Sequence, residues 1–211
     1  MNFNYEVETR FYFKDEHELN DKLPFLKKYF DREIEWRTKH YGLDLFKQDI
    51  ILRINESSVD NSNFVTLGYK ERDIGGEINI RKEYDEDIRN GIVNSSILGK
   101  LGLINSLKSV DDIEMLLERK GFGKFMSFNG RSILGYFKDL NFSLKLMMCK
   151  SIGFPCILEI ERVSKSFKDV DKHKLDILKF VNEYNLLNIL LKDEPPTLLY
   201  KKLFYDNGCK A

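Results

Sequence analysis

Two pairs of glutamates are spaced so that they could hold a divalent metal ion. Glu6 and Glu8 lie near one end of the sequence, and Glu159 and Glu161 lie much further along it. A spacing of two residues on a β-strand places both carboxylates of a pair on the same face, about 7 Å apart. Two such pairs facing each other would form a cage of hard oxygen ligands, which suits a cation such as Mg²⁺.

Basic side chains on other expected strands could bind the anion that such a metal ion would bridge. They are Arg53, Lys70, Arg81 and Arg131. A closed barrel could gather these groups inside a solvated lumen, with the acids towards one side and the bases towards the other. That arrangement suits a polyanion bridged by a metal ion, and a triphosphate is the natural example.

The same carboxylates have an ordinary alternative interpretation as solvated strand faces. Charged residues make up 32% of the chain, and the Glu-x-Glu pattern recurs as Glu16/Glu18 and Glu33/Glu35. The first of these pairs falls on an expected helix, where positions i and i+2 point to different faces. The second begins an expected strand and can be solvated. Spacing alone therefore leaves the choice between a metal site and surface charge open.

Composition excludes several classes of protein. The 211 residues hold 34 Lys+Arg and 34 Asp+Glu, and this balance argues against a basic surface for nucleic acid or anionic lipid. No segment approaches the roughly 20 apolar residues that span a bilayer, and the first residues lack the basic and apolar stretches of a secretory signal. Cys149, Cys156 and Cys209 have no CxxC spacing and are typical of reduced thiols. The sequence therefore predicts one cytoplasmic domain over residues 1–211.

Strands must position most of the charged side chains. Alternation is clearest over residues 3–13, where Phe3, Tyr5 and Val7 share one face and Glu6 and Glu8 share the other. Eight strands are expected, at 3–13, 36–41, 50–55, 64–72, 78–83, 131–138, 142–148 and 157–163. Helical periodicity is confined to 15–29, two short pieces within 85–120, and 169–184, and a strand-like tail is expected at 197–205. This order predicts an α+β fold dominated by antiparallel strands, with helices outside the sheet.

Short motifs follow one another in an order that resembles a known family. They are Glu6-Val-Glu8-Thr-Arg10, Leu52-Arg53-Ile-Asn55, Leu67-Gly-Tyr-Lys70, Arg81-Lys-Glu83, the strand with Arg131, Gly153-Phe-Pro-Cys-Ile-Leu-Glu159-Ile-Glu161 and Leu199-Tyr200-Lys-Lys-Leu203. The ordered set resembles the CYTH superfamily, the triphosphate tunnel metalloenzymes. That family includes class IV adenylate cyclases, thiamine triphosphatases and inorganic triphosphatases.

The resemblance implies a fold, a site and an activity. The fold would be a closed eight-stranded antiparallel β-barrel around a polar triphosphate tunnel, with flanking helices. Glu6, Glu8, Glu159 and Glu161 would be the catalytic residues and would hold Mg²⁺ or Mn²⁺, with Glu83 as a further ligand. The substrate-binding residues would be Arg10, Arg53, Lys70, Arg81, Arg131 and Lys145. The activity would be metal-dependent hydrolysis of inorganic triphosphate, a nucleoside triphosphate or thiamine triphosphate, with release of orthophosphate.

Departures from the family pattern keep two alternative functions open. Arg10 replaces a lysine, Asn55 and Asn129 replace two expected bases, and Lys145 stands about where many members carry an aspartate. One alternative is a class IV-type adenylate cyclase that makes cyclic AMP and pyrophosphate. The other is a non-catalytic module that binds a nucleotide or polyphosphate. The expected partner is a triphosphate-bearing small molecule, or nucleic acid only as a 5′-triphosphate end. The sequence does not decide between a monomer and a homodimer.

Overall fold

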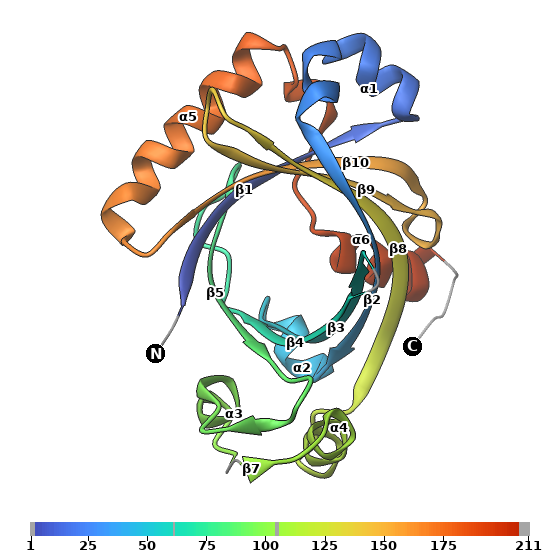
Figure 1. Cartoon of the computed structure of the whole chain (residues 1–211), viewed down its shortest axis with the longest axis vertical. Coiled ribbons are helices and arrows are strands. Elements are labelled where there is room, and N and C mark those ends of the chain that lie inside the picture. The colour runs from blue at the N-terminus through green and yellow to red at the C-terminus, as the bar shows by residue number, and fades with distance from the viewer. Residues whose placement is uncertain (1–2, 61, 104–105, 207–211) are drawn as a thin grey trace.

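Eight antiparallel strands close into a barrel in a computed structural model, which describes residues 3–60, 62–103 and 106–206 (Figure 1). The strands are β1 (Asn4–Phe13), β2 (Phe30–Tyr41), β3 (Ile51–Val59), β4 (Ser62–Lys70), β5 (Asn79–Asp87), β8 (Lys124–Phe137), β9 (Phe142–Cys149) and β10 (Phe154–Ser164). Their order around the barrel is β10-β9-β8-β2-β3-β4-β5-β1, and β1 pairs back with β10. Each expected strand falls on one of these eight, and the closed α+β barrel is confirmed.

The first strand is buried on both faces, for different reasons. Val7 and Phe11 point out of the barrel into a hydrophobic core beneath α1 (Glu16–Lys22) and α5 (Val170–Glu183). Figure 1 shows both helices on the same side of the barrel. The helix α5 contributes Ile177 and Phe180 to that core. Because alternate residues of a strand point to opposite faces, this packing turns Glu6 and Glu8 into the barrel.

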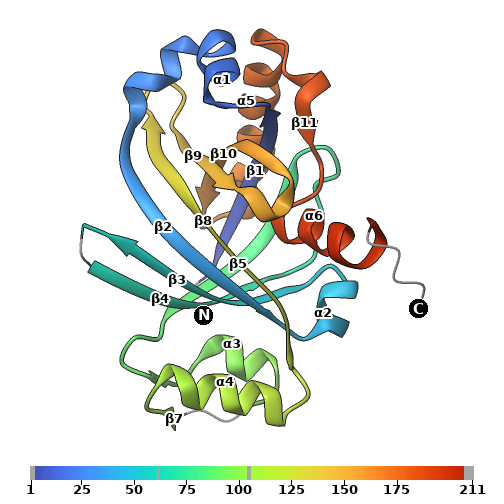
Figure 2. The same cartoon turned by 90° about the vertical axis from the view of Figure 1, so that its right-hand side faces the viewer.

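Two further helices lie below the barrel in the view of Figure 2. They are α3 (Ser96–Lys100) and α4 (Val110–Arg119), and they pack on the outside of β3, β4 and β5 through a second hydrophobic core. The α4 helix begins as the sequence predicts, because Ser109 Oγ accepts a hydrogen bond from Asp112 N at 3.1 Å. Short strands β6 (Ile92–Val93) and β7 (Ser106–Leu107) pair beside them.

The segment after α5 differs from expectation. Residues 197–205 were expected to form a strand, and this prediction is wrong: α6 (Pro195–Lys201) and a π-helical turn (Lys202–Asp206) occupy them. Proline is favoured in the first turn of a helix, where its missing N–H needs no partner, so the Pro-Pro pair starts this helix. The short strand β11 (Leu190–Leu191), which precedes α6, pairs with β1.

Short helical segments connect several of the larger elements. The helix α2 (Leu43–Lys47), which the sequence did not predict, lies at the same end of the barrel as α6 (Figure 2). Short 3₁₀ turns span Pro24–Tyr29, Lys150–Ile152, Phe167–Asp169 and Leu187–Ile189. Cys149 and Cys156 are buried free thiols, and Cys209 lies outside the described residues. No helix in the described part of the chain has the length and apolar character needed to cross a bilayer.

Candidate functional site

Strand register brings the predicted carboxylates together inside the barrel. Glu8 stands opposite Glu161 in the pairing of β1 with β10, and Arg10 stands opposite Glu159. On its other edge β1 pairs with β5, which sets Arg81 opposite Glu6. Directly opposed residues share a face of the sheet, so all these side chains lie on the inner side. The two Glu-x-Glu pairs are therefore neighbours, although about 150 residues separate them in sequence.

A cavity of about 400 Å³ occupies the barrel interior. One side of its wall is charged, with Glu6, Glu83, Asp85, Glu159, Glu161, Glu194, Arg10, Arg53, Lys70 and Lys145. The other side is largely uncharged and is formed by Ile34, Trp36, Thr38, His40, Phe128, Met147, Pro195 and Pro196. Trp36, Ser57 and Phe128 also line a wider, open cavity that includes Phe64 on the β3–β4 hairpin. The tunnel thus opens at the hairpin end and is closed by the start of α6 at the other.

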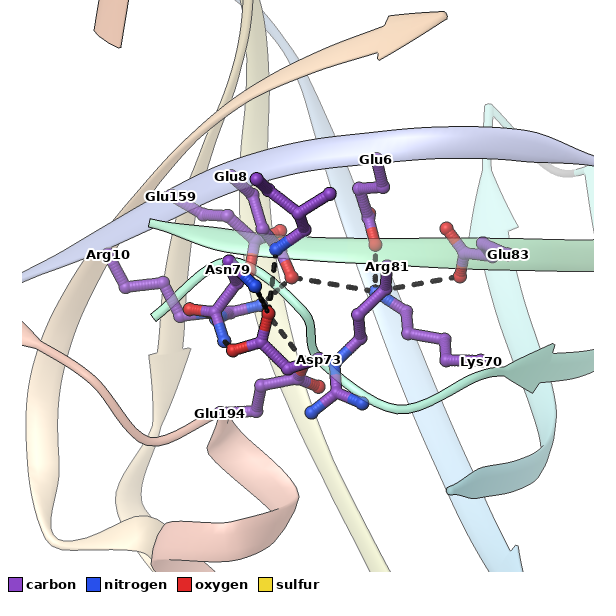
Figure 3. Close-up of polar contacts among 12 residues, drawn as sticks. Glu6, Glu8, Arg10, Lys70, Asp73, Asn79, Arg81, Glu83, Glu159 and Glu194 are labelled. Carbon is purple, nitrogen blue, oxygen red and sulfur yellow. Dashed lines mark hydrogen bonds and ion pairs between the residues drawn. The ribbon is translucent and has the colours of Figure 1, made fainter. Parts of the chain in front are cut away.

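Each base in the tunnel already contacts a carboxylate. Arg10 Nε donates to Glu159 Oε2 at 2.8 Å, and its guanidinium also pairs with Glu8. Lys70 Nζ pairs with Glu6 and lies 3.6 Å from Glu83 Oε1, as Figure 3 shows.

Arg53 Nη2 donates to Glu83 Oε1 at 2.7 Å, and Lys145 Nζ lies 3.4 Å from Glu159 Oε1. Acidic side chains outnumber basic ones in this part of the wall. The tunnel is therefore crossed by internal ion pairs and retains surplus carboxylate.

Burial and mutual repulsion make ionisation of three glutamates costly. Burial raises the pKa of Glu6 to about 7, with a further contribution from the charge of Glu83. Burial likewise raises the pKa of Glu8 to about 8, against the lowering effect of Arg10. The pKa of Glu161 is raised by burial and by its glutamate neighbours.

Glu159 behaves in the opposite way. Burial alone would raise its pKa, but the charges of Lys145 and Arg10 bring it below the usual range. The two members of one Glu-x-Glu pair thus have opposite electrostatic environments.

The donor chemistry of this site fits Mg²⁺ or Mn²⁺. Carboxylate oxygens are the ligands that these ions prefer, and the buried Glu8 Oε2 has no hydrogen-bond partner. Glu161 adds a second carboxylate whose ionised form a cation would stabilise. In the described part of the chain, no three acidic, histidine or cysteine side chains already converge as a finished metal site. Glu6 and Glu8 would have to turn from Lys70 and Arg10 to form one.

The structure places Arg131 away from the other predicted residues. Its side chain is 47% exposed and points outward from β8, where Nη1 donates to Glu33 Oε1 at 3.0 Å. The inward positions on either side are Gly130 and Ser132, and Ser132 Oγ accepts a hydrogen bond from Trp36 Nε1. The expectation that Arg131 faces the tunnel interior is therefore wrong: its side chain lies on the outer side of β8 and lines the wider, open cavity instead.

The structure also shows where the two asparagines that replace expected bases lie, and which groups Arg81 contacts. Asn129 is exposed on the outer face of β8, so the replacement of a basic residue at this position does not reduce the positive charge of the tunnel wall. Asn55, in contrast, lines the cavity. Arg81 lies in the wall, but its guanidinium is fully engaged: Nη1 donates to the backbone oxygens of Asp49 and Glu71 at 2.9 and 2.7 Å. Arg81 therefore holds the barrel wall together as well as carrying charge.

Sequence reasoning missed two buried ionisable residues of the cavity, Glu194 and His40. Glu194, which precedes Pro195, is only 3% exposed and accepts a hydrogen bond from Arg81 Nε at 2.5 Å. His40 is stacked on Phe128, and burial lowers its pKa to about 3, so its ring is neutral. Alternation on β2 could have indicated the inward position of His40. No spacing signal indicated Glu194, because it belongs to an irregular segment.

Comparisons with known proteins support the fold. No protein-family model matches the chain, and no curated protein matches it. Among solved structures, the PH1819 protein of Pyrococcus horikoshii OT3 is similar with a TM-score of 0.72 and 21% identity, over 93% of this chain and 99% of that one. A "putative adenylate cyclase" of Vibrio parahaemolyticus has a TM-score of 0.64 and 12% identity, over 93% and 98% of the two chains.

A third structure is a "putative adenylyl cyclase" of Hippeastrum, described as having a dominant triphosphatase activity. It has a TM-score of 0.60 and 16% identity, over 94% of this chain and 95% of that one. At these sequence identities the comparisons show a shared fold and nothing more specific. The chain therefore shares its fold with these three structures, and the closed barrel is the fold that the resemblance to the CYTH superfamily predicted.

Proposed function

We propose that this protein is a metal-dependent hydrolase of triphosphate-containing substrates. The observation that carries the proposal is the cavity inside the barrel, in which surplus carboxylates from β1 and β10 face basic residues from β3, β4 and β9. A divalent cation would stabilise the ionised form of these carboxylates, which is unfavourable in its absence. The nearby basic side chains are suited to binding phosphate oxygens.

The chain's own residues would act mainly by binding and positioning. Phosphoryl transfer requires alignment of the reacting groups and neutralisation of charge rather than covalent chemistry by the protein. Arg53 and Lys70 would contact phosphate oxygens, Arg53 through its two-pronged guanidinium. Lys145, the most exposed base of the cavity wall, would contact the phosphates nearer the outer part of the tunnel. Arg10 would join them after release from Glu8.

The metal site would be formed by Glu6, Glu8, Glu159 and Glu161, with Glu83 beside them. A bound Mg²⁺ or Mn²⁺ would supply charge neutralisation and a means of orienting the attacking water. The Hippeastrum protein shares the fold and is described as having a dominant triphosphatase activity. Hydrolysis is therefore the first reaction to test.

A non-catalytic binding module is the second candidate, and one observation favours it. Arg10 and Lys70 lie between the carboxylates that a metal ion would need, as Figure 3 shows for Lys70 between Glu6 and Glu83. If these ion pairs persist when a ligand is bound, the tunnel would hold a nucleotide or polyphosphate without turning it over.

Product identification separates these functions. The protein is incubated with tripolyphosphate, ATP, thiamine triphosphate or 5′-triphosphate RNA in the presence of Mg²⁺ or Mn²⁺. Orthophosphate supports the hydrolase, pyrophosphate with cyclic AMP indicates a cyclase, and binding without product indicates the module. Glu161→Gln should lose the hydrolysis, whereas the matched exposed variant Glu33→Gln should retain it.

A further inference from the structure

The segment before α6 inserts a carboxylate into the closed end of the tunnel. Leu190 and Leu191 pair with β1, with Leu191 opposite Arg10, and three residues later Glu194 lines the cavity. Glu194 occupies the N-cap position of α6, where a carboxylate commonly accepts a hydrogen bond from the first turn. Its side chain makes no such bond. It points instead towards the bases of the tunnel.

Those bases surround Glu194 as they would surround a phosphate group. Arg81 Nε donates to Glu194 Oε1 at 2.5 Å, and Arg10 Nη2 lies 4.0 Å from the same oxygen (Figure 3). Lys70 and Arg53 line the same cavity. Burial alone would raise the pKa of Glu194, but the charges of these four bases lower it to about 2. Glu194 is therefore ionised, and its carboxylate is the anion that Arg81 and Arg10 contact at the inner end of the tunnel.

We propose that Glu194 is an internal competitor that occupies the place of the innermost phosphate group, so that an anionic ligand must displace its side chain. This inference rests on the proposed function in one respect, namely that the tunnel binds a polyphosphate. Only the side chain needs to turn away, because α6 is held independently by Leu199 in the core with Met126 and Ile152. The consequence is that affinity for the substrate is set partly by how tightly Arg81 and Arg10 hold Glu194.

Replacement of Glu194 by glutamine tests the proposal. Glu194→Gln keeps the size of the side chain and removes the competing charge. Binding of tripolyphosphate is measured by calorimetry in metal-free buffer, which separates binding from turnover. We expect the variant to bind about tenfold more tightly than the wild type, since removing one negative charge within about 4–8 Å of an anion relieves a repulsion of that size.

The adjacent acid provides a matched control. Asp193 lies outside the tunnel, 35% exposed, and pairs with Lys201 at 2.6 Å. Asp193→Asn removes the same charge one residue away and should change the dissociation constant less than twofold. Glu194→Asp keeps the charge but withdraws it by one methylene group, so it should bind with an affinity between those of the wild type and Glu194→Gln. That variant gives the answer if Glu194→Gln does not fold.

The outcomes distinguish this inference from the proposed hydrolase. Equal or weaker binding by the Glu194 variants overturns the competitor role, even if the wild type hydrolyses triphosphates in the presence of metal. Tighter binding by Glu194→Gln supports the role, even if no variant turns substrate over. Absence of binding by every variant overturns it as well.

Discussion

Glu159 and Glu161 should respond in opposite directions when each is replaced by glutamine in the metal-free protein. Glu159 accepts a hydrogen bond from Arg10 at 2.8 Å. Removing it leaves a buried guanidinium under-neutralised, which typically costs about 3–5 kcal/mol of unfolding free energy. We therefore expect Glu159→Gln to be strongly destabilised.

Glu161 has no ion-pairing cation within residues 3–60, 62–103 and 106–206, and it stands directly opposite Glu8. At an effective dielectric constant of about 20, two charges about 6 Å apart repel by about 3 kcal/mol. Because the pKa of Glu8 is about 8 and that of Glu161 is also raised, only part of this repulsion is present near neutral pH. The rest appears as the free-energy cost of protonating these carboxylates on folding, which Glu161→Gln also removes. We expect Glu161→Gln to raise the free energy of unfolding by about 1–2 kcal/mol.

Urea denaturation at about pH 7.5, at low salt and with a chelator, measures both changes. Glu33→Gln is the control, since Glu33 is 53% exposed on the outer surface and its loss should change stability by no more than about 0.5 kcal/mol. The reasoning would be refuted if both inner variants shifted stability in the same direction, because the two carboxylates would then have equivalent environments.

Three other outcomes are expected. The free energy of unfolding of the metal-free protein should fall as the pH rises from about 5 to 8.5, since Glu6 and Glu8 have folded pKa values of about 7 and 8 against an ordinary 4.5, and the protonated forms favour folding. A flat series of urea midpoints would contradict this. Mg²⁺ or Mn²⁺ should raise the melting temperature more at about pH 8 than at about pH 5.5, because protons compete for the same carboxylates; equal shifts in calorimetry would argue against a site there. Arg53→Ala should weaken tripolyphosphate binding about tenfold or more, whereas Arg131→Ala should leave the dissociation constant unchanged. A larger effect of Arg131→Ala than of Arg53→Ala in calorimetry would contradict this.

Alternation predicted the barrel strands because most of them separate apolar and charged residues cleanly. On β1 the phase is unambiguous, and the inward positions of Glu6, Glu8 and Arg10 follow directly from it. On β8 both phases mix polar and apolar residues, since Ser132 faces inward and Ile133 packs outside. The sequence around Arg131 therefore gave no reliable phase, and the motif order assigned it to the wrong face.

The rest of the site could not be predicted because it depends on tertiary contacts. Glu194 belongs to a segment without periodicity, and only the pairing of Leu191 with Arg10 brings it to the tunnel. The Pro195–Pro196 pair indicated an interruption, but the helix that it starts became apparent only in the structure. Which carboxylate pairs with which base likewise depends on barrel closure, not on spacing along a strand.

The seam between β1 and β10 has a consequence for how the protein folds. Arg10 and Glu159 meet across it although 149 positions separate them in sequence. Contacts at such separation incur a loop-closure entropy before they contribute stability, so we expect them to form late in folding. The part of the tunnel where Glu8 stands opposite Glu161 would then be assembled late, from two strands whose carboxylates repel each other. A cation that lowers this repulsion would act on the rate of barrel closure as well as on the finished fold.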